Sequence, residues 1–573
     1  MRVLLVYPNI ATRNGPHYPH GLGVLTAALA AAGHEPVVRL VESMPTQDGW
    51  LRELETIGPD LVACSFGSHQ WRHARSLMSW SRQSGYRVLA GGVHATFATD
   101  DVWRSGACDW VCVGEGEGAL LDLAAGIDPA QIANLCGDGF ANPVRPLIDD
   151  LDQSPIYDRR HFPMREICRV NAGEVAVLVG RGCPFPCTYC CNSAWRELYH
   201  GAHWVRWRSA RRVLDEIELL RSRYPVESFY FEDDIFTLNR EFRDEFLDGY
   251  RRAIGLPFRC YLRIGEVDRD DLRRLRDAGL ALANVGVEHG DERFRAEVLG
   301  RRMTNRQIED FFGWSRELGI RTRAFHIVGA PGETPAALRA TVELCERVAP
   351  DEVQVSLFEP YPGTQLHALC REQGLIKGVE RDTYFHATPA ITLRDFPDDD
   401  LVRAYEDFCA RAPQIEARAF ELALEAHRRG DLDLVAAWSA ERVAQQGAEP
   451  VARVRVRLGD DERFCLFAHP RSEIVYDLEP GAYRLETALA LDPRCLNWGG
   501  GGVRFVVDVR GEVVLDRFLD PKHNAADQGW QQESARFNVS ESTTLVLSTR
   551  PDEAGDLTAL WALWGHPHLV REC

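Results

Sequence analysis

The chain has 573 residues, enough for three or four domains that each bury a core of their own. Its formal net charge of −19 argues against broad binding to nucleic acids or anionic membranes, and no run approaches the roughly 18 apolar residues of a membrane span. The apolar run Met1–Pro8 is too short for a signal peptide, and 16 cysteines in so long a chain do not suggest a disulfide scaffold, so we expect a cytoplasmic protein.

The N-terminal part alternates short apolar strands with helices. Strands are predicted at Val3–Tyr7, Leu61–Ser65, Val88–Ala90 and Trp110–Val113, and helices at Leu22–Ala32 and Trp71–Ser84. This pattern is typical of a doubly wound parallel sheet, which binds its ligand beyond the carboxyl ends of the strands. The loops at that edge all contain glycine, which lets the backbone approach a bulky ligand closely.

Three segments of this part, Pro19–Leu25, Gly91–Thr96 and Val113–Gly118, resemble the cobalamin-binding domain that precedes many radical S-adenosylmethionine (SAM) cores. The resemblance implies a flavodoxin-like fold with cobalamin at the strand ends. The contacts that it implies are Pro8, Gly21, Ser65, Gly67, Ser68, His69, Gly91, Gly92, His94, Gly114, Glu115 and Gly116. Alternatively, the domain has lost its ligand or binds a nucleotide, although the acidic run Gly114–Gly118 would repel phosphate.

The residues that would meet the lower face of the cobalt are left open by the sequence. The Asp-x-His-x-x-Gly loop of other cobalamin proteins is missing, because Asn9–Gly15 stands in its place. Ser68, His69 and Gln70 are the candidates that remain. For His69 the plainer alternative is a solvated loop histidine.

A loop with three cysteines stands in the middle of the chain. Cys183, Cys187 and Cys190 form a C-x3-C-x2-C pattern with Tyr189 directly before the third. Thiolates suit iron–sulfur clusters, and three of them leave one iron of a four-iron cluster open and therefore reactive. The alternatives are a disulfide or a structural zinc site, for which adjacent Cys191 is poorly placed as a fourth ligand.

The cysteine loop follows the first of six predicted strand–helix units. Strands are predicted at Val175–Gly180, Ser228–Phe231, Phe258–Arg263, Ala283–Val287, Arg323–Val328 and Val353–Phe358. Helices are predicted at Arg211–Tyr224, Arg240–Ile254, Asp270–Ala278, Asn305–Leu318 and Pro335–Val348. Six such units predict a partial parallel barrel with its active site at the carboxyl ends of the strands.

The cysteine spacing and its aromatic residue resemble the signature of the radical SAM superfamily, in which the open iron binds the amino and carboxylate groups of SAM. The implied SAM contacts are Tyr189, Asp233, Asp234, Arg263, Glu288 and Gly329. The two aspartates would hold the SAM ammonium or order the cluster loop, Arg263 would pair with a carboxylate, and Gly329 would meet the purine. Glu288 resembles the ribose-contacting position. Singly, each charged residue could instead be a solvated cap or a salt bridge.

The insert Trp195–Arg208 is dense in aromatic residues and arginine. It would either form a wall on which cobalamin or the substrate stacks, or pack its rings onto the barrel as an ordinary loop.

The C-terminal third changes from helical to alternating patterns. Asp398–Gln446 has helical periodicity, whereas Arg453–Arg457, Tyr483–Thr487, Val503–Val509 and Thr544–Ser548 are predicted strands of an antiparallel sandwich. The ending Leu557–Pro567 resembles jelly-roll carbohydrate-binding modules, which suggests contact with a glycan. Docking to a protein or dimerisation is the alternative.

Together these patterns predict an α/β protein with a doubly wound parallel sheet, a partial (β/α)6 barrel and a C-terminal β-sandwich. The expected parts are a cobalamin-binding domain (1–140), a linker (141–168), a radical SAM core (169–395), a helical extension (396–449) and the sandwich (450–573).

The resemblance implies an enzyme that uses a [4Fe–4S] cluster, SAM and cobalamin to methylate an unactivated carbon of a small molecule. Its electrons would come from a donor such as flavodoxin or ferredoxin. The alternatives are rearrangement, ring contraction or cyclisation without methyl transfer, and a cobalamin-binding sensor or assembly protein.

Overall fold

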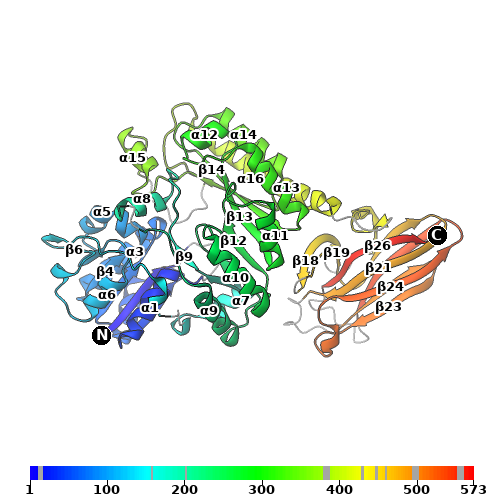
Figure 1. Cartoon of the computed structure of the whole chain (residues 1–573), viewed down its shortest axis with the longest axis horizontal. Coiled ribbons are helices and arrows are strands. Elements are labelled where there is room, and N and C mark those ends of the chain that lie inside the picture. Colours follow the sequence, from blue (N-terminus) through cyan, green and yellow to red (C-terminus); the bar gives the residue numbers. More distant parts are fainter. Residues whose placement is uncertain are drawn as a thin grey trace. The chain divides into compact units, whose positions relative to one another are not determined.

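The computed structural model describes residues 1–10, 17–155, 159–200, 203–378, 387–426, 432–445, 450–458, 461–492, 502–551 and 561–572 (Figure 1). They form two compact units, Met1–Ala419 and Phe420–Cys573. The finer predicted boundaries at 140, 168, 395 and 449 stay predictions. No helix among the described residues is long and apolar enough to cross a bilayer.

The first unit begins with a sheet of order β2-β1-β3-β4-β5-β6-β7, parallel as far as β5 and antiparallel beyond it. Its strands are β1 (Arg2–Pro8), β2 (Glu35–Val41), β3 (Leu61–Ser65), β4 (Val88–Gly91), β5 (Trp110–Cys112), β6 (Leu135–Gly137) and β7 (Phe140–Ala141). Its helices are α1 (His20–Ala31), α2 (Gln47–Ile57), α3 (Trp71–Gln83), α4 (Val93–Phe97), α5 (Thr99–Arg104) and α6 (Glu117–Ala124). The order 2-1-3-4-5 is flavodoxin-like, as predicted.

The edge strand β2 was not predicted from the sequence. Half of it is exposed or intermediate, and Pro36 and Arg39 interrupt its apolar run, so its local signal is weak. The four predicted strands of this sheet are all present.

The six-stranded sheet that follows has the order β15-β14-β13-β12-β11-β8, and all its pairs are parallel. Its strands are β8 (Glu174–Val177), β11 (Ser228–Phe231), β12 (Phe258–Leu262), β13 (Leu280–Glu288), β14 (Arg321–Val328) and β15 (Glu352–Leu357). All six predicted strands are confirmed. In Figure 1 helices α10, α11 and α13 run along the outside of these strands, which gives the partial barrel.

The helices around the barrel are α7 (Met164–Val170), α8 (Cys191–Leu198), α9 (Ala210–Arg223), α10 (Arg240–Ala253), α11 (Arg269–Asp277), α12 (Glu292–Glu297), α13 (Asn305–Glu317), α14 (Pro335–Val348) and α15 (Gln365–Glu372). Local residues fix where several of them begin. The Thr304 side chain accepts a hydrogen bond from the backbone N–H of Gln307, and the Gln307 side chain accepts one from the backbone N–H of Thr304. Asp268 caps α11 in the same way. These capping boxes explain why α13 begins at the predicted residue and α11 one residue before the predicted start.

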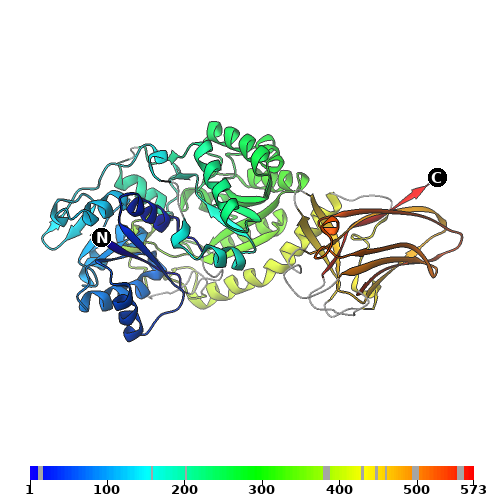
Figure 2. The same cartoon turned by 90° about the horizontal axis from the view of Figure 1, so that it is seen from below.

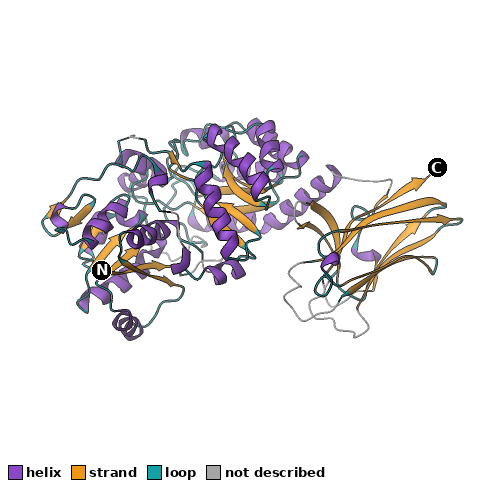
Figure 3. Cartoon of the chain, turned by 60° about the horizontal axis from the view of Figure 1, so that its bottom comes forward, coloured by secondary structure: helices purple, strands orange, loops and turns teal. Residues whose placement is uncertain are grey.

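The second unit is a sandwich of two antiparallel sheets (Figure 3). One has the order β18-β19-β26-β21-β24, with β16 beside β26, and the other β17-β20-β25-β22-β23. The strands are β16 (Leu432–Asp433), β17 (Val443–Gln445), β18 (Ala452–Leu458), β19 (Asp461–Ala468), β20 (Ser472–Leu478), β21 (Gly481–Leu491), β22 (Val503–Val509), β23 (Glu512–Leu519), β24 (Gln531–Val539), β25 (Thr543–Pro551) and β26 (Ala562–Glu572). The predicted sandwich is confirmed.

The helical prediction for Asp398–Gln446 is correct only for its first part. Helix α16 (Asp398–Ala426), the long yellow helix of Figure 2, is followed by the short strands β16 and β17. Val435, which the helical periodicity included, is buried in the core of the sandwich. Burial between two sheets therefore overrides the local helical pattern in this segment.

Candidate functional site

The cysteine loop leaves the barrel directly after β8. A short strand, β9 (Gly180–Arg181), comes first, then Cys183, Cys187 and Cys190, and α8 begins at the next residue. The three thiols are free, and Cys183 lies close enough to the other two for their charges to act on it. Burial raises the pKa of the Cys183 thiol to about 12, so its thiolate needs the positive charge of a metal centre.

The donor set fits an iron–sulfur cluster better than a single ion. Among the described residues, no group of three or more His, Cys, Asp or Glu surrounds one point where a metal ion would sit. A four-iron cluster does not require such convergence, because each thiolate binds a different iron. A closed zinc site, in contrast, needs four ligands around one ion.

The strand end beneath the loop is held by Asp233, which follows β11. Its carboxylate accepts hydrogen bonds from the backbone N–H of Val179 (3.0 Å) and Gly180 (2.6 Å) and is almost fully buried. Burial raises the pKa of Asp233 to about 7, although these N–H donors oppose the shift. Of the two roles expected for Asp233, this geometry supports the ordering of the cluster loop.

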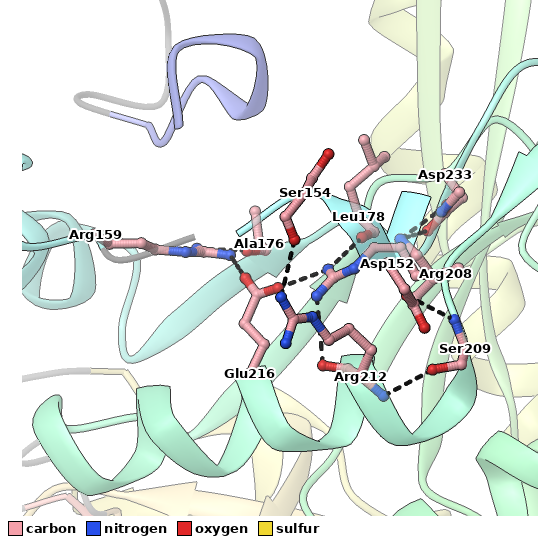
Figure 4. Close-up of polar contacts among 12 residues, drawn as sticks. Asp152, Ser154, Arg159, Ala176, Leu178, Arg208, Ser209, Arg212, Glu216 and Asp233 are labelled. Carbon is pink, nitrogen blue, oxygen red and sulfur yellow. Dashed lines mark hydrogen bonds and ion pairs between the residues drawn. The ribbon is translucent and has the colours of Figure 1, made fainter. Parts of the chain in front are cut away.

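Two buried arginines and one glutamate hold the same strand from the other side (Figure 4). Glu216 of α9 accepts from Arg159 (2.8 Å) and from Arg208 (2.6 Å), and the side chains of all three are at most 4% exposed. Arg159 also donates to the carbonyl of Ala176, and Arg208 to that of Leu178. This triad therefore fixes the backbone that leads into the cluster loop.

The aromatic residue of the cysteine pattern is tied to the fourth strand of the barrel. The Tyr189 hydroxyl donates to Glu288 (2.9 Å), and Arg301 pairs with Glu288 (3.3 Å) and donates to the carbonyl of Gly286 (2.7 Å). Glu288 has a φ of 65° at an irregular point in the β13–β14 register. Such backbone strain is typical of functional positions, and here it turns the carboxylate toward Tyr189.

Two further implied SAM contacts lie beside the loop. Arg263 follows β12, with one N–H 3.8 Å from the Cys187 sulfur. Asp234 is exposed, and it lines the 420 Å³ cavity described below. Its carboxylate accepts a hydrogen bond from the side chain of Asn192 (2.7 Å), which also donates to the Cys190 sulfur (3.7 Å). The loop is thus contacted by residues from the second and third barrel strands.

Gly329 lies at the end of β14, with a φ of 83° that favours glycine. Its backbone N–H donates to the buried Glu333, which also receives a contact from His289 (3.1 Å). Its local geometry is therefore fixed by a buried network at the end of the fifth strand.

A cavity of about 420 Å³ lies between the carboxyl ends of the N-terminal sheet and the cysteine loop. It brings together seven of the predicted cobalamin contacts: Gly21, Ser65, Gly91, Gly92, Gly114, Glu115 and Gly116. From the other side it is lined by Cys191, Asn192 and Asp234. Aliphatic side chains between the sheet and its helices extend the cavity, which suits a large cofactor with apolar and polar parts.

Two of the glycines that line this cavity, Gly92 and Gly114, have no room for a side chain. At Gly92, with a φ of 94°, a Cβ atom would lie 2.7 Å from the backbone nitrogen and oxygen of Phe66. At Gly21, in contrast, a Cβ atom would have no protein atom within 4 Å, because this glycine faces open space. These glycine loops, at residues 21, 91–92 and 114–116, form a cradle with open space for a bulky ligand such as cobalamin.

Acidic residues of this cavity are neutralised by two arginines, Arg181 of β9 and Arg206 of the short strand β10 (Arg206–Trp207) that pairs with it. Glu115 binds Arg181 (2.9 Å) and Arg206 (2.5 Å), and Arg181 also binds Glu117 (2.7 Å). Burial alone would raise the pKa of Glu115, but the two guanidinium groups outweigh it and the net shift is downward. These ion pairs connect the N-terminal domain to the cluster loop, a role that the sequence did not indicate.

The aromatic insert forms one wall of the same cavity. The rings of Trp195, Tyr199 and Trp204 stand nearly parallel, with centroids 5.6 to 6.2 Å apart. Trp195 and Trp204 line the cavity, and the Tyr199 hydroxyl accepts from the N–H of Glu115 (2.8 Å). Of the two expectations for the insert, the structure supports the wall.

The remaining predicted cobalamin contacts lie around β3. The side-chain amide of Gln70 is engaged by the backbone, since it accepts from the N–H of Gly67 (2.6 Å) and donates to the carbonyl of Pro8 (2.7 Å). Pro8 and Gly67 thus anchor Gln70 and do not line the 420 Å³ cavity. His94 contacts Ser68 (3.0 Å) through Nδ1, and burial lowers the pKa of His94 to about 4, so its ring is neutral.

A second cavity, of about 530 Å³, lies on the other side of these residues. Ser68, His69 and His94 line it from the N-terminal domain, and His69 meets Tyr361 edge to face. Tyr189 and the residues of β14 and β15 line it from the barrel. Of the predicted SAM contacts, Tyr189 lines this second cavity and Asp234 lines the first, whereas Asp233, Arg263, Glu288 and Gly329 line neither.

Sequence reasoning missed Arg159, Arg208 and Glu216 beneath the loop, Arg301 beside it, and the pairing of Arg181 with the cradle. Arg181 lies two residues before Cys183, so its charge could have been matched to the acidic loop at Glu115.

Two family models match the chain. Residues 177–345 match the Radical SAM superfamily, and residues 7–124 match the B12 binding domain. The first match begins at the end of β8 and includes the cysteine loop. The second covers the sheet that forms the cradle.

Known proteins agree with these matches. An uncharacterized methyltransferase of Pyrococcus horikoshii is 25% identical over 447 residues, which cover 74% of this chain and 95% of the relative. An anaerobic magnesium-protoporphyrin IX monomethyl ester cyclase of Rubrivivax gelatinosus is 26% identical over 393 residues, 64% of this chain and 69% of the relative. The solved structure of the radical SAM methyltransferase TsrM from Kitasatospora setae, with cobalamin and a [4Fe–4S] cluster bound, has a TM-score of 0.56 at 22% identity and covers 65% of this chain and 75% of its own. At this identity the likeness shows a shared fold.

The barrel, its cysteine loop and the family match define a radical SAM enzyme. The chain therefore combines a Radical SAM domain with a B12 binding domain. The first implies a [4Fe–4S] cluster and SAM as cofactors, and the second implies cobalamin.

Proposed function

We propose that this enzyme methylates an unactivated carbon of a small molecule. The observation that carries the proposal is the 420 Å³ cavity, which has the glycine cradle on one side and the cysteine loop on the other. A methyl carrier held there would stand next to the centre where SAM is cleaved. Holding reacting groups in a fixed geometry is the main contribution a protein makes to cofactor chemistry.

Three cofactors would be held by different parts of the chain. Cys183, Cys187 and Cys190 would bind the cluster, and the glycine loops would bind cobalamin. SAM would lie at the open iron near Tyr189 and Glu288, with Asp234, Arg263 and Gly329 as further candidate contacts. When bound, the reduced cluster and SAM supply a radical that removes hydrogen from the substrate carbon, and cobalamin supplies the methyl group.

The larger cavity is our candidate for the substrate. It is lined by Tyr189 of the cluster loop and by His69 and His94 of the N-terminal domain. Gln354 and Ser356 occupy alternate positions of β15 and both line this cavity, so their side chains share one face of the strand. We propose them as groups that orient the substrate by hydrogen bonds.

The test is an anaerobic reaction of the reconstituted enzyme with SAM that carries a deuterated methyl group and with candidate natural-product precursors. Methylation predicts a product that gains one carbon with all three deuterium atoms, whereas cyclisation or ring contraction gives a product without them. The C187A variant is the matched control and should release no 5′-deoxyadenosine. A protein without four-iron absorbance after reconstitution would support the sensor or assembly alternative.

Partners and location follow from the same reasoning. Reduction of the cluster requires an electron donor, for which we propose a flavodoxin or ferredoxin. The 14 described cysteines are all free, which supports a reducing cytoplasm.

For the C-terminal sandwich we propose contact with a glycan or a protein. The resemblance that suggested a glycan lies partly outside the described residues.

A further inference from the structure

Arg263 is a buried cation without a carboxylate partner. It is 8% exposed, and no ion pair joins it to a carboxylate within the described ranges of the chain. Glu288, on the next strand, is paired with Arg301. The charge of Arg263 acts on Glu288 only from beyond ion-pair distance, so this buried guanidinium still requires a closer counter-charge in the site.

The groups that do contact Arg263 belong to the cysteine loop. Its Nη1 atom donates toward the sulfur of Cys187 at 3.8 Å. The guanidinium carbon lies 3.7 Å from the centre of the Phe185 ring. The ring attracts the cation and keeps water from it, and the thiolate carries the opposite charge.

We propose that Arg263 sets the reduction potential of the iron–sulfur cluster through its hydrogen bond and charge at Cys187. This proposal rests on the cluster of the proposed function but not on methyl transfer. One-electron reduction makes a cluster more negative by one charge, and the electron comes from the external donor. A fixed cation a few ångströms away stabilises that reduced form and so raises the potential.

This role differs from the one that the sequence suggested, where Arg263 pairs with a carboxylate of the ligand. Here the residue is a positioning residue that acts through Cys187. The two roles are separable, because a ligand contact changes the affinity for SAM, whereas a charge beside the sulfur changes the potential without SAM.

The experiment is an EPR-monitored redox titration of the cluster in the anaerobically reconstituted full-length enzyme, without SAM, for wild type, R263Q and R263K. Iron content is measured first, so that a failure to assemble the cluster is not mistaken for a shift. R274Q is the matched control, since it also removes one arginine charge from this barrel, but from an exposed side chain on α11.

We expect R263Q to make reduction at least about tenfold less favourable, which for a one-electron couple is a fall of about 59 mV per tenfold. R263K keeps the charge but cannot stack a planar group on Phe185, so its potential should lie between those of R263Q and wild type. R274Q should match wild type.

An R263Q potential equal to that of R274Q would overturn the proposal. If the same variant, with its potential unchanged, also bound SAM more weakly, Arg263 would be assigned to the ligand instead. If R263Q assembles no cluster, R263K decides: a potential below wild type supports the proposal, and an unchanged one refutes it.

Discussion

Replacing Glu216 by glutamine tests whether the buried triad holds the strand beneath the cluster loop. Glu216 is fully buried, and each of its oxygens receives one guanidinium, from Arg159 at 2.8 Å and Arg208 at 2.6 Å. Burial alone would raise the pKa of Glu216, yet the two arginines outweigh it and the net shift is downward. The E216Q variant therefore leaves two buried cations without a counter-charge, which costs roughly 3–5 kcal/mol.

Two quantities are measured: the free energy of unfolding from the first transition in urea, and the iron content after reconstitution. The matched control is E317Q, because Glu317 pairs with Arg269 at the surface, where both side chains are about half exposed. That pair should contribute less than about 1 kcal/mol. E216Q should also bind less iron, since Arg159 and Arg208 hold the backbone that leads to Cys183. Equal losses of stability in the two variants would refute this reasoning.

Three further predictions concern the cradle and the strand end. G92A should lower the free energy of unfolding by more than about 2 kcal/mol and weaken cobalamin binding, because its Cβ would meet the backbone of Phe66. The control G106A, at a glycine with a positive φ but open space around it, should lose only about 1 kcal/mol. Thermal unfolding and cobalamin titration check both variants. E115Q should lower cobalamin affinity severalfold in equilibrium binding, since Arg181 and Arg206 lose their partner, and unchanged affinity would contradict the interpretation. For Asp233 the folded pKa of about 7 lies above the ordinary value of 3.8, so burial of its charge costs stability as the pH rises from about 4 to 7. D233N lacks this titration, so wild type should lose up to about 4 kcal/mol relative to D233N across that window in urea unfolding; parallel curves would count against it.

The parallel strands of the first unit other than β2 could be predicted because each is a short apolar run bounded by turn residues. The barrel strand Ser228–Phe231 and helix Pro335–Val348 have the same bounds in the sequence prediction and in the structure. The weak edge strand β2 and the segment after α16 were missed or misassigned. In both cases the neighbours in space decide the structure, and the local pattern does not.

The site was predicted where its residues stand close together in the sequence. Cys183, Cys187 and Cys190 share one loop, so their spacing alone indicates a cluster. Glu115 and Arg206, in contrast, are 91 residues apart, and Tyr189 and Glu288 are 99 apart. No periodicity relates such pairs, because they meet only when the sheet and the barrel have formed.

The sequence by itself indicated the cysteine loop, the glycine loops and the parallel strands of the two sheets, because each depends on residue types at short spacing. Only the tertiary structure decided that Asp233 holds backbone, that Arg263 faces a sulfur, and that two arginines neutralise Glu115. The physical reason is that a buried charge is stable only beside its partner, and that partner can come from any part of the chain.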